Sequence, residues 1–206
     1  MIYFCDNDII QKVAAFDLWG ELLATLGLQR GDLTVLSTAQ FKFGLRDPAK
    51  GEGKYGPVVF GRIRDVVTSA STLTQQIDPV DEALLAEVLG IDAGEAQLFS
   101  AASRDSTSIL ATGDKRSLLA LLGEPKCAPI ATRLAGRVHC LETLVRQMIQ
   151  QVGFTSIKAK VVPAYACDTG IRAAFGSGLE STQEAVLAGL DAYLGDFAKH
   201  NVKLFA

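Results

Sequence analysis

The sequence predicts an α/β fold with a central parallel sheet flanked by helices, followed by an α-helical C-terminal extension. Two short apolar runs, at residues 2–5 and 108–111, read as buried strands, and each leads directly to an acid and then to a helical pattern. From Gly123 onward the pattern is almost entirely helical. Hydrophobic residues make up 49% of the 206 residues and charged residues 21%, so we expect a packed core rather than disorder.

Helical periods follow the predicted strands throughout the N-terminal part. A further short strand is expected at residues 33–36. The helical intervals are residues 9–26, 57–67, 79–89, 92–103 and 114–122. The stretch 43–56 is rich in glycine, contains Pro48 and has few apolar residues, so it is predicted to be a mobile loop.

The C-terminal part is predicted to contain helices at residues 134–152, 164–175 and 181–199. This divides the chain into an α/β domain at 1–123 and a helical extension at 124–206 that packs on it. Two apolar stripes with helical spacing run through the extension, one formed by Leu134, Val138, Leu141, Leu144, Val145 and Met148, the other by Ala185, Val186, Leu187, Leu190, Tyr193, Leu194 and Phe197. One small sheet face cannot obviously cover both stripes, so a homodimer through the extension is a further expectation.

Charge and cysteine usage exclude several classes of protein. The net charge of −3 gives no general attraction to nucleic acid, so a polyanion would need a local basic patch or a metal ion. The most basic window, residues 42–64, offers Lys42, Arg46 and Lys54 as phosphate contacts, with a solvated surface loop as the alternative. Four cysteines without Cys-x-x-Cys spacing and two histidines argue against a zinc site or a disulfide framework.

The cytoplasm is the expected compartment, because no basic leader precedes an apolar stretch. Trp19 is the single tryptophan, so the sequence offers no evident aromatic platform for stacking bases.

Carboxylates at two strand ends form the principal candidate site. Asp6 follows the first strand, and Asp114 follows the strand at 108–111, while Glu95 opens the helix that leads into the latter. Ligands of parallel α/β sheets bind at the carboxyl ends of strands, so these acids can share one pocket. Three converging carboxylates suit a hard divalent cation such as Mg²⁺.

Helix capping is the alternative explanation for each of these acids. Asp92 and Glu95 have the spacing of a capping box, and Asp6 and Asp114 each stand where an N-cap is expected. Asp8 is interpreted as a residue that compensates the helix dipole.

The segment 3–10, the string Asp-Ala-Gly-Glu-Ala at 92–96 and the strand-to-helix segment 109–116 together resemble a PIN domain. The resemblance covers about residues 1–123 and implies a three-layer fold and a metal-dependent ribonuclease that hydrolyses phosphodiester bonds of single-stranded RNA with Mg²⁺ or Mn²⁺. It implies Asp6, Glu95 and Asp114 as catalytic residues and metal ligands, with Asp92 as a further ligand. Lys115 and Arg116 would then contact substrate phosphates.

Two other functions remain open from the sequence. Many PIN domains carry one more acid between the first two motifs. No acid between Asp6 and Asp92 stands in a sequence context that matches such a motif. This gap favours a catalytically incomplete binding or assembly module. A regulatory protein partner is compatible with either function. Asp6-Asn7-Asp8 also resembles the opening of haloacid-dehalogenase phosphatases, with Asp6 as nucleophile and Asp8 as general acid, but no second acid follows Asp114 at the required place.

Overall fold

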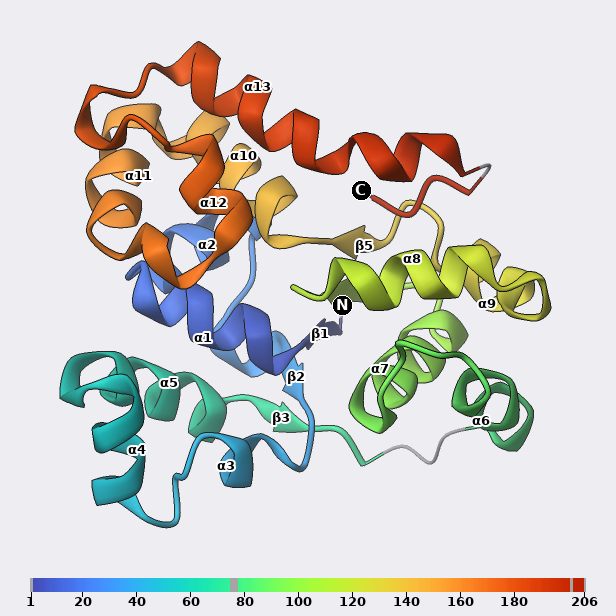
Figure 1. The fold of residues 1–206 in the computed structure, drawn as a ribbon. Coiled ribbons are helices and arrows are strands. Elements are labelled where there is room, and N and C mark those ends of the chain that lie inside the picture. The colour runs from blue at the N-terminus through green and yellow to red at the C-terminus, as the bar shows by residue number, and fades with distance from the viewer. Residues whose placement is uncertain (1, 75–77, 201, 206) are drawn as a thin grey trace.

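A computed structural model describes residues 2–74, 78–200 and 202–205. Within them, five parallel strands form one sheet in the order β3-β2-β1-β4-β5, with helices on both faces (Figure 1). The strands are β1 (Tyr3–Cys5), β2 (Leu33–Val35), β3 (Ser71–Thr72), β4 (Ile109–Ala111) and β5 (Val138–His139). The predicted α/β class with a central parallel sheet is confirmed.

The strand order reverses next to β1. The chain steps outward from β1 to β2 and β3, and then returns to place β4 on the other side of β1. Cys5 pairs with Ala111, so the carboxyl ends of β1 and β4 lie side by side. Such a reversal leaves a crevice where neither connection covers the strand ends, and open α/β sheets bind their ligands there.

Two hydrophobic clusters hold the layers together. Alternate side chains of β1 point to opposite faces of the sheet, so Tyr3 and Cys5 join one cluster and Phe4 joins the other. The Tyr3 cluster includes side chains from the helices α1 (Asn7–Ala15), α2 (Trp19–Leu26), α5 (Pro57–Ser69) and α10 (Leu141–Val152). The Phe4 cluster includes side chains from α6 (Pro79–Ala86), α7 (Ala93–Arg104), α8 (Lys115–Gly123) and α9 (Ala128–Leu134).

The single helix predicted over 9–26 is two helices. α1 and α2 are separated by Asp17, whose backbone has a φ of 58°, in the left-handed region. The periodicity did not reveal this break because both helices bury apolar residues against the same cluster. The helices that follow begin close to their expected positions, because Asp78, Asp92 and Asp114 each accept hydrogen bonds from the first helical turn.

The prediction of a mobile loop over residues 43–56 is wrong. After α3 (Ala39–Lys42), the chain forms α4 (Pro48–Tyr55), which begins with Asp47 as N-cap and Pro48 in the first turn. The glycines taken as flexibility signals include Gly51, which is buried against the ring of Phe60. A Cβ atom built on Gly51 would lie 2.2 Å from Cε2 of Phe60, so this glycine permits close helix packing.

Gly51→Ala and Gly53→Ala should therefore have opposite effects on the free energy of unfolding. Both positions lie inside α4, where alanine gains up to about 1 kcal/mol of helix propensity over glycine. A Cβ on Gly53 meets nothing within 4 Å, whereas Phe60 is 1% exposed and has little room to move. We expect Gly53→Ala to stabilise the protein and Gly51→Ala to destabilise it by about 1–3 kcal/mol in urea unfolding. Equal effects of the two substitutions would contradict the packing described here.

The extension is not purely helical. The helix predicted over 134–152 is instead the end of α9, the strand β5 and the helix α10, with Gly136 in the turn at a φ of 69°. β5 pairs with β4, and residue 205 forms a parallel bridge with Val138. The segment beyond the predicted boundary at Gly123 thus supplies an edge of the central sheet. It continues through α11 (Phe154–Val161), α12 (Thr169–Ala174) and α13 (Gln183–Leu194).

The first apolar stripe of the extension is buried within the chain. All six of its members are at most 1% exposed: Leu134, Val138, Leu141, Leu144, Val145 and Met148. This stripe therefore needs no second copy to cover it, and the homodimer stays a prediction that depends on the other stripe.

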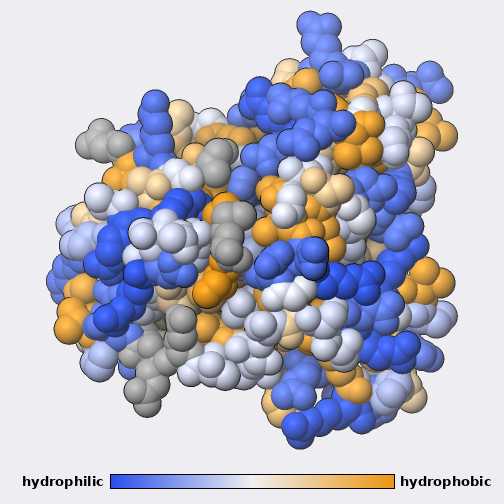
Figure 2. Space-filling model, turned by 180° about the vertical axis from the view of Figure 1, so that it is seen from behind, coloured by the Kyte–Doolittle hydropathy of each residue, from blue (hydrophilic) through white to orange (hydrophobic). Residues whose placement is uncertain are grey.

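The face in Figure 2 carries hydrophobic side chains in small groups among hydrophilic ones. No helix of the described residues combines the length and apolar character needed to cross a bilayer.

Candidate active site

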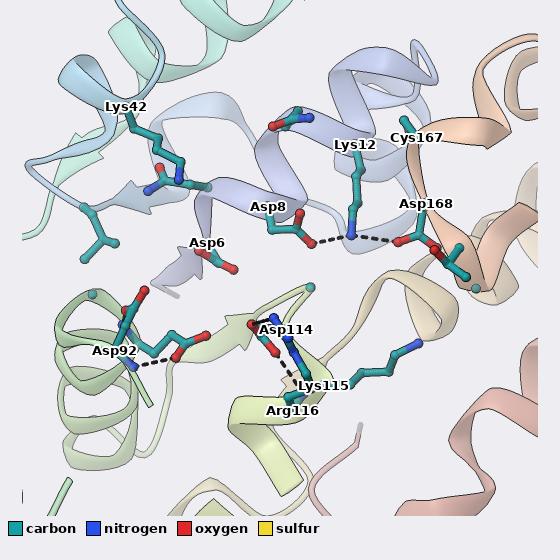
Figure 3. Close-up of a pocket in the computed structure, with 18 of the residues that line it drawn as sticks. Asp6, Asp8, Lys12, Lys42, Asp92, Asp114, Lys115, Arg116, Cys167 and Asp168 are labelled. Atoms are coloured by element: carbon teal, nitrogen blue, oxygen red, sulfur yellow. Dashed lines mark hydrogen bonds and ion pairs between the residues drawn. The ribbon is translucent and has the colours of Figure 1, made fainter. Parts of the chain in front are cut away.

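A pocket of about 1010 Å³ opens at the strand ends where the sheet order reverses (Figure 3). Its lining includes all four acids expected to bind metal and three of the five predicted substrate contacts: Asp6, Asp92, Glu95, Asp114, Lys42, Lys115 and Arg116. Arg46 and Lys54 are not among the lining residues. They stand over aromatic rings instead, Arg46 over Phe41 and Lys54 over Tyr55.

Asp6 is fixed at the meeting point of β1 and β4. Its backbone N–H donates to the carbonyl oxygen of Ala111 at 2.9 Å, which extends the pairing of the two strands by one residue. Its carboxylate accepts a hydrogen bond from the hydroxyl of Thr112 at 3.3 Å. Burial, and then the nearby charge of Asp8, raise the pKa of Asp6 from 3.8 to about 6. A carboxylate whose charge is destabilised in this way is suited to a cationic ligand.

Glu95 and Asp92 form the predicted capping box at the start of α7. Each side chain accepts a hydrogen bond from the other's backbone N–H, both at 2.8 Å. Glu95 is nevertheless part of the pocket wall, and burial raises its pKa from 4.5 to about 7, with the charges of Asp92 and Asp114 adding to the shift. The structural and the functional interpretation of this glutamate are therefore compatible.

Asp114 also has both a capping role and a place in the pocket. One of its carboxylate oxygens accepts hydrogen bonds from the backbone N–H groups of Arg116 and Ser117. The other lies 3.5 Å from the guanidinium of Arg116, a side chain that is 90% exposed. Figure 3 shows Asp6 and Asp114 directed into the same space.

The donor set fits a hard divalent cation in its chemistry but is not a ready-made coordination shell. The capping bonds of Asp92, Glu95 and Asp114 occupy one oxygen of each carboxylate, and the second oxygen of Asp114 pairs with the exposed side chain of Arg116. Among the described residues, no three His, Cys, Asp or Glu side chains are placed close enough to hold a metal ion together. Binding by these acids would thus require side-chain rotation within the pocket.

The structure adds an ion-pair network that the sequence did not predict. Lys12 bridges the carboxylates of Asp8 and Asp168, and all three residues line the pocket. Burial alone would lower the pKa of Lys12, but its two carboxylate partners hold that pKa above its ordinary value. The i,i+4 spacing of Asp8 and Lys12 was a visible signal, whereas Asp168 lies too far along the chain to be found without the fold.

Gly113 allows Asp8 to approach the segment after β4. A Cβ on Gly113 would lie 1.9 Å from Oδ2 of Asp8, so a larger residue would displace that carboxylate. Asp8 lies in the first turn of α1, as its predicted interaction with the helix dipole requires, and it also lines the pocket, where its charge helps to raise the pKa of Asp6.

Lys115 is held by the C-terminal part of the chain. It forms an ion pair with Glu142, which is 2% exposed at the start of α10, and its ammonium lies 4.7 Å from the ring centroid of Tyr193 on α13. A buried carboxylate thus fixes the position of one predicted substrate contact. Lys42 lies across the pocket, near the end of α3 (Figure 3).

Comparison of this chain with protein-family models gave no match, and comparisons with curated proteins and with solved structures gave no significant match.

Proposed function

We propose that this protein is a Mg²⁺- or Mn²⁺-dependent ribonuclease that hydrolyses phosphodiester bonds of single-stranded RNA in this pocket. The observation that carries the proposal is that three carboxylates from separate segments, Asp6, Glu95 and Asp114, line one pocket at the point where the strand order reverses. Burial raises the pKa of both Asp6 and Glu95, as expected for acids whose charge is balanced by a bound cation. The resemblance of residues 1–123 to PIN domains supports the same conclusion.

The residues of the pocket have distinct roles in this proposal. Asp6, Glu95 and Asp114 would hold the cation, with Asp92 as a further ligand, and the bound cation would activate water and neutralise phosphate charge. Thr112 orients Asp6 through its hydroxyl group. Lys42 and Arg116 would contact flanking phosphates, while Lys115, held by Glu142, contributes a fixed positive charge.

Calorimetric titration with Mn²⁺ tests the cation site directly. We expect binding at about pH 8 that weakens as the pH falls through about 7 and then 6, because protons then compete first for Glu95 and next for Asp6. The same preparation should cleave a single-stranded RNA oligomer, and EDTA should abolish the cleavage. Cleavage that persists in EDTA would exclude the proposed chemistry.

A binding or assembly module without catalysis is the second candidate. It is favoured by the finding that no three potential ligands are preassembled in the described part of the chain. A module of this kind need not bind Mn²⁺, so the absence of a calorimetric signal together with intact RNA would support it over the ribonuclease.

A further inference from the structure

Two partly exposed aromatic side chains line the pocket that contains the acids. Phe41 is 59% exposed on α3, and Tyr193 is 37% exposed on α13. The two residues are brought to one pocket from opposite parts of the chain. The single tryptophan of the sequence predicts no aromatic platform for bases, and Trp19 is indeed 6% exposed in the core and unavailable to a ligand. Phe41 and Tyr193 instead bring aromatic surface to the pocket.

Phe41 contributes little to the core. Its neighbour Phe43 is 1% exposed and belongs to the cluster that contains Tyr3, whereas the ring of Phe41 remains mostly in solvent. The guanidinium carbon of Arg46 lies 4.4 Å from the centroid of this ring. Isolated exposed apolar residues are common on proteins, but this one borders a charged pocket and has a cation over one face of its ring.

Tyr193, which lines the same pocket, has a similar environment. The ammonium of Lys115 lies 4.7 Å from its ring centroid, and the ion pair with buried Glu142 keeps that ammonium in place. Figure 3 shows Lys42, the chain neighbour of Phe41, and Lys115 on opposite sides of Asp6 and Asp114. Both rings belong to the lining of the pocket that contains the acids, and each has a basic group over one of its faces, which leaves the other face for a ligand.

We propose that Phe41 and Tyr193 are base-stacking platforms that hold an unpaired stretch of RNA across the acids. The inference rests on the proposed function and specifies its substrate as a strand with accessible, unstacked bases. Proteins that bind single strands combine aromatic faces for the bases with basic groups for the backbone, and this pocket provides both. Base-paired RNA would not expose its base faces to these rings.

Fluorescence anisotropy with two probes of equal length tests this proposal. One probe is a labelled single-stranded RNA oligomer, and the other has the same backbone without bases. Binding is measured with Ca²⁺ in place of Mg²⁺ and Mn²⁺, and a gel confirms that the probes remain intact. The variants are Phe41→Ala and Tyr193→Ala, with Phe41→Tyr and Tyr193→Phe as ring-retaining variants. Leu179→Ala, at a 66% exposed residue outside the pocket lining, is the matched control.

We expect each alanine variant to weaken binding of the base-containing probe by roughly 5-fold to 100-fold. The ring-retaining variants and the control should bind like the parent protein, and the abasic probe should bind weakly and equally to all of them. Equal binding of the two probes, or unchanged binding by both alanine variants, would overturn the inference. Failure of the proposed function appears separately, as ring-dependent RNA binding by a protein that shows no calorimetric Mn²⁺ binding and no cleavage.

Discussion

Replacing Asp6 with asparagine should abolish metal-dependent cleavage of RNA while making the protein more stable. Asparagine keeps the size of the side chain and the N-cap preference at the start of α1, but it removes the charge at the centre of the proposed cation site. We expect cleavage to fall by roughly 100-fold or more, as for the loss of other groups that stabilise charge in a transition state. Cleavage would be measured with a labelled single-stranded oligomer.

The gain in stability should depend on pH in a definite direction. The pKa of Asp6 is raised from 3.8 to about 6, so the folded state binds the proton more tightly than the unfolded state, and stability falls as pH rises through this range. Removing the charge should therefore stabilise the protein by up to roughly 3 kcal/mol at about pH 8 and by almost nothing below about pH 4. Urea unfolding in EDTA measures this difference without a contribution from bound metal.

Asp65→Asn is the matched control, because Asp65 is an exposed acid on α5 and is not part of the pocket lining. It should change neither cleavage nor stability appreciably. If Asp6→Asn changed the stability equally at about pH 8 and at low pH, folding would not destabilise the charge of Asp6, and the raised pKa would have to be abandoned as support for a cation site.

Replacing Lys12 with methionine should be strongly destabilising. Lys12 joins α1 to Asp168, the N-cap of α12, and the side chains of Lys12 and Asp168 are 13% and 12% exposed. Methionine keeps the apolar stem but removes the ammonium that bridges the carboxylates of Asp8 and Asp168. Breaking a buried pair in this way costs about 3–5 kcal/mol. Chemical unfolding at neutral pH gives the value.

The exposed pair between Arg146 and Asp191 provides the comparison. Its side chains are 41% and 47% exposed, so Arg146→Met should cost less than about 1 kcal/mol. The cost of Lys12→Met should shrink as the pH falls below about 4, because the pKa of Asp168 is lowered by Lys12 and its stabilising charge is then lost. A cost that is small at neutral pH would show that the network does not hold α1 and α12 together.

Local patterns were sufficient for the α/β class and for the order of most elements. Short apolar runs predicted β1, β2 and β4, and the acids at 78, 92 and 114 predicted where three helices begin, because a capping side chain acts on its own first turn. Local patterns failed at residues 43–56 and 134–152. In the first, Gly51 suggests a flexible loop, but the close contact with Phe60 requires a glycine at this position of a helix. In the second, the strand β5 has only two residues, and it is defined by its pairing with β4 rather than by a local pattern.

The sequence by itself determined which acids stand at strand ends and helix starts, since adjacent residues in the chain decide this. Only the tertiary structure decided which of them meet and what surrounds them. The reversal of strand order beside β1 brings Asp6 and Asp114 to one crevice. The chain beyond Gly123 then supplies Asp168 and Tyr193 to the pocket wall, and it supplies Glu142 as the ion-pair partner of Lys115. Contacts between segments so distant in sequence depend on packing of the whole chain, and no local spacing encodes them.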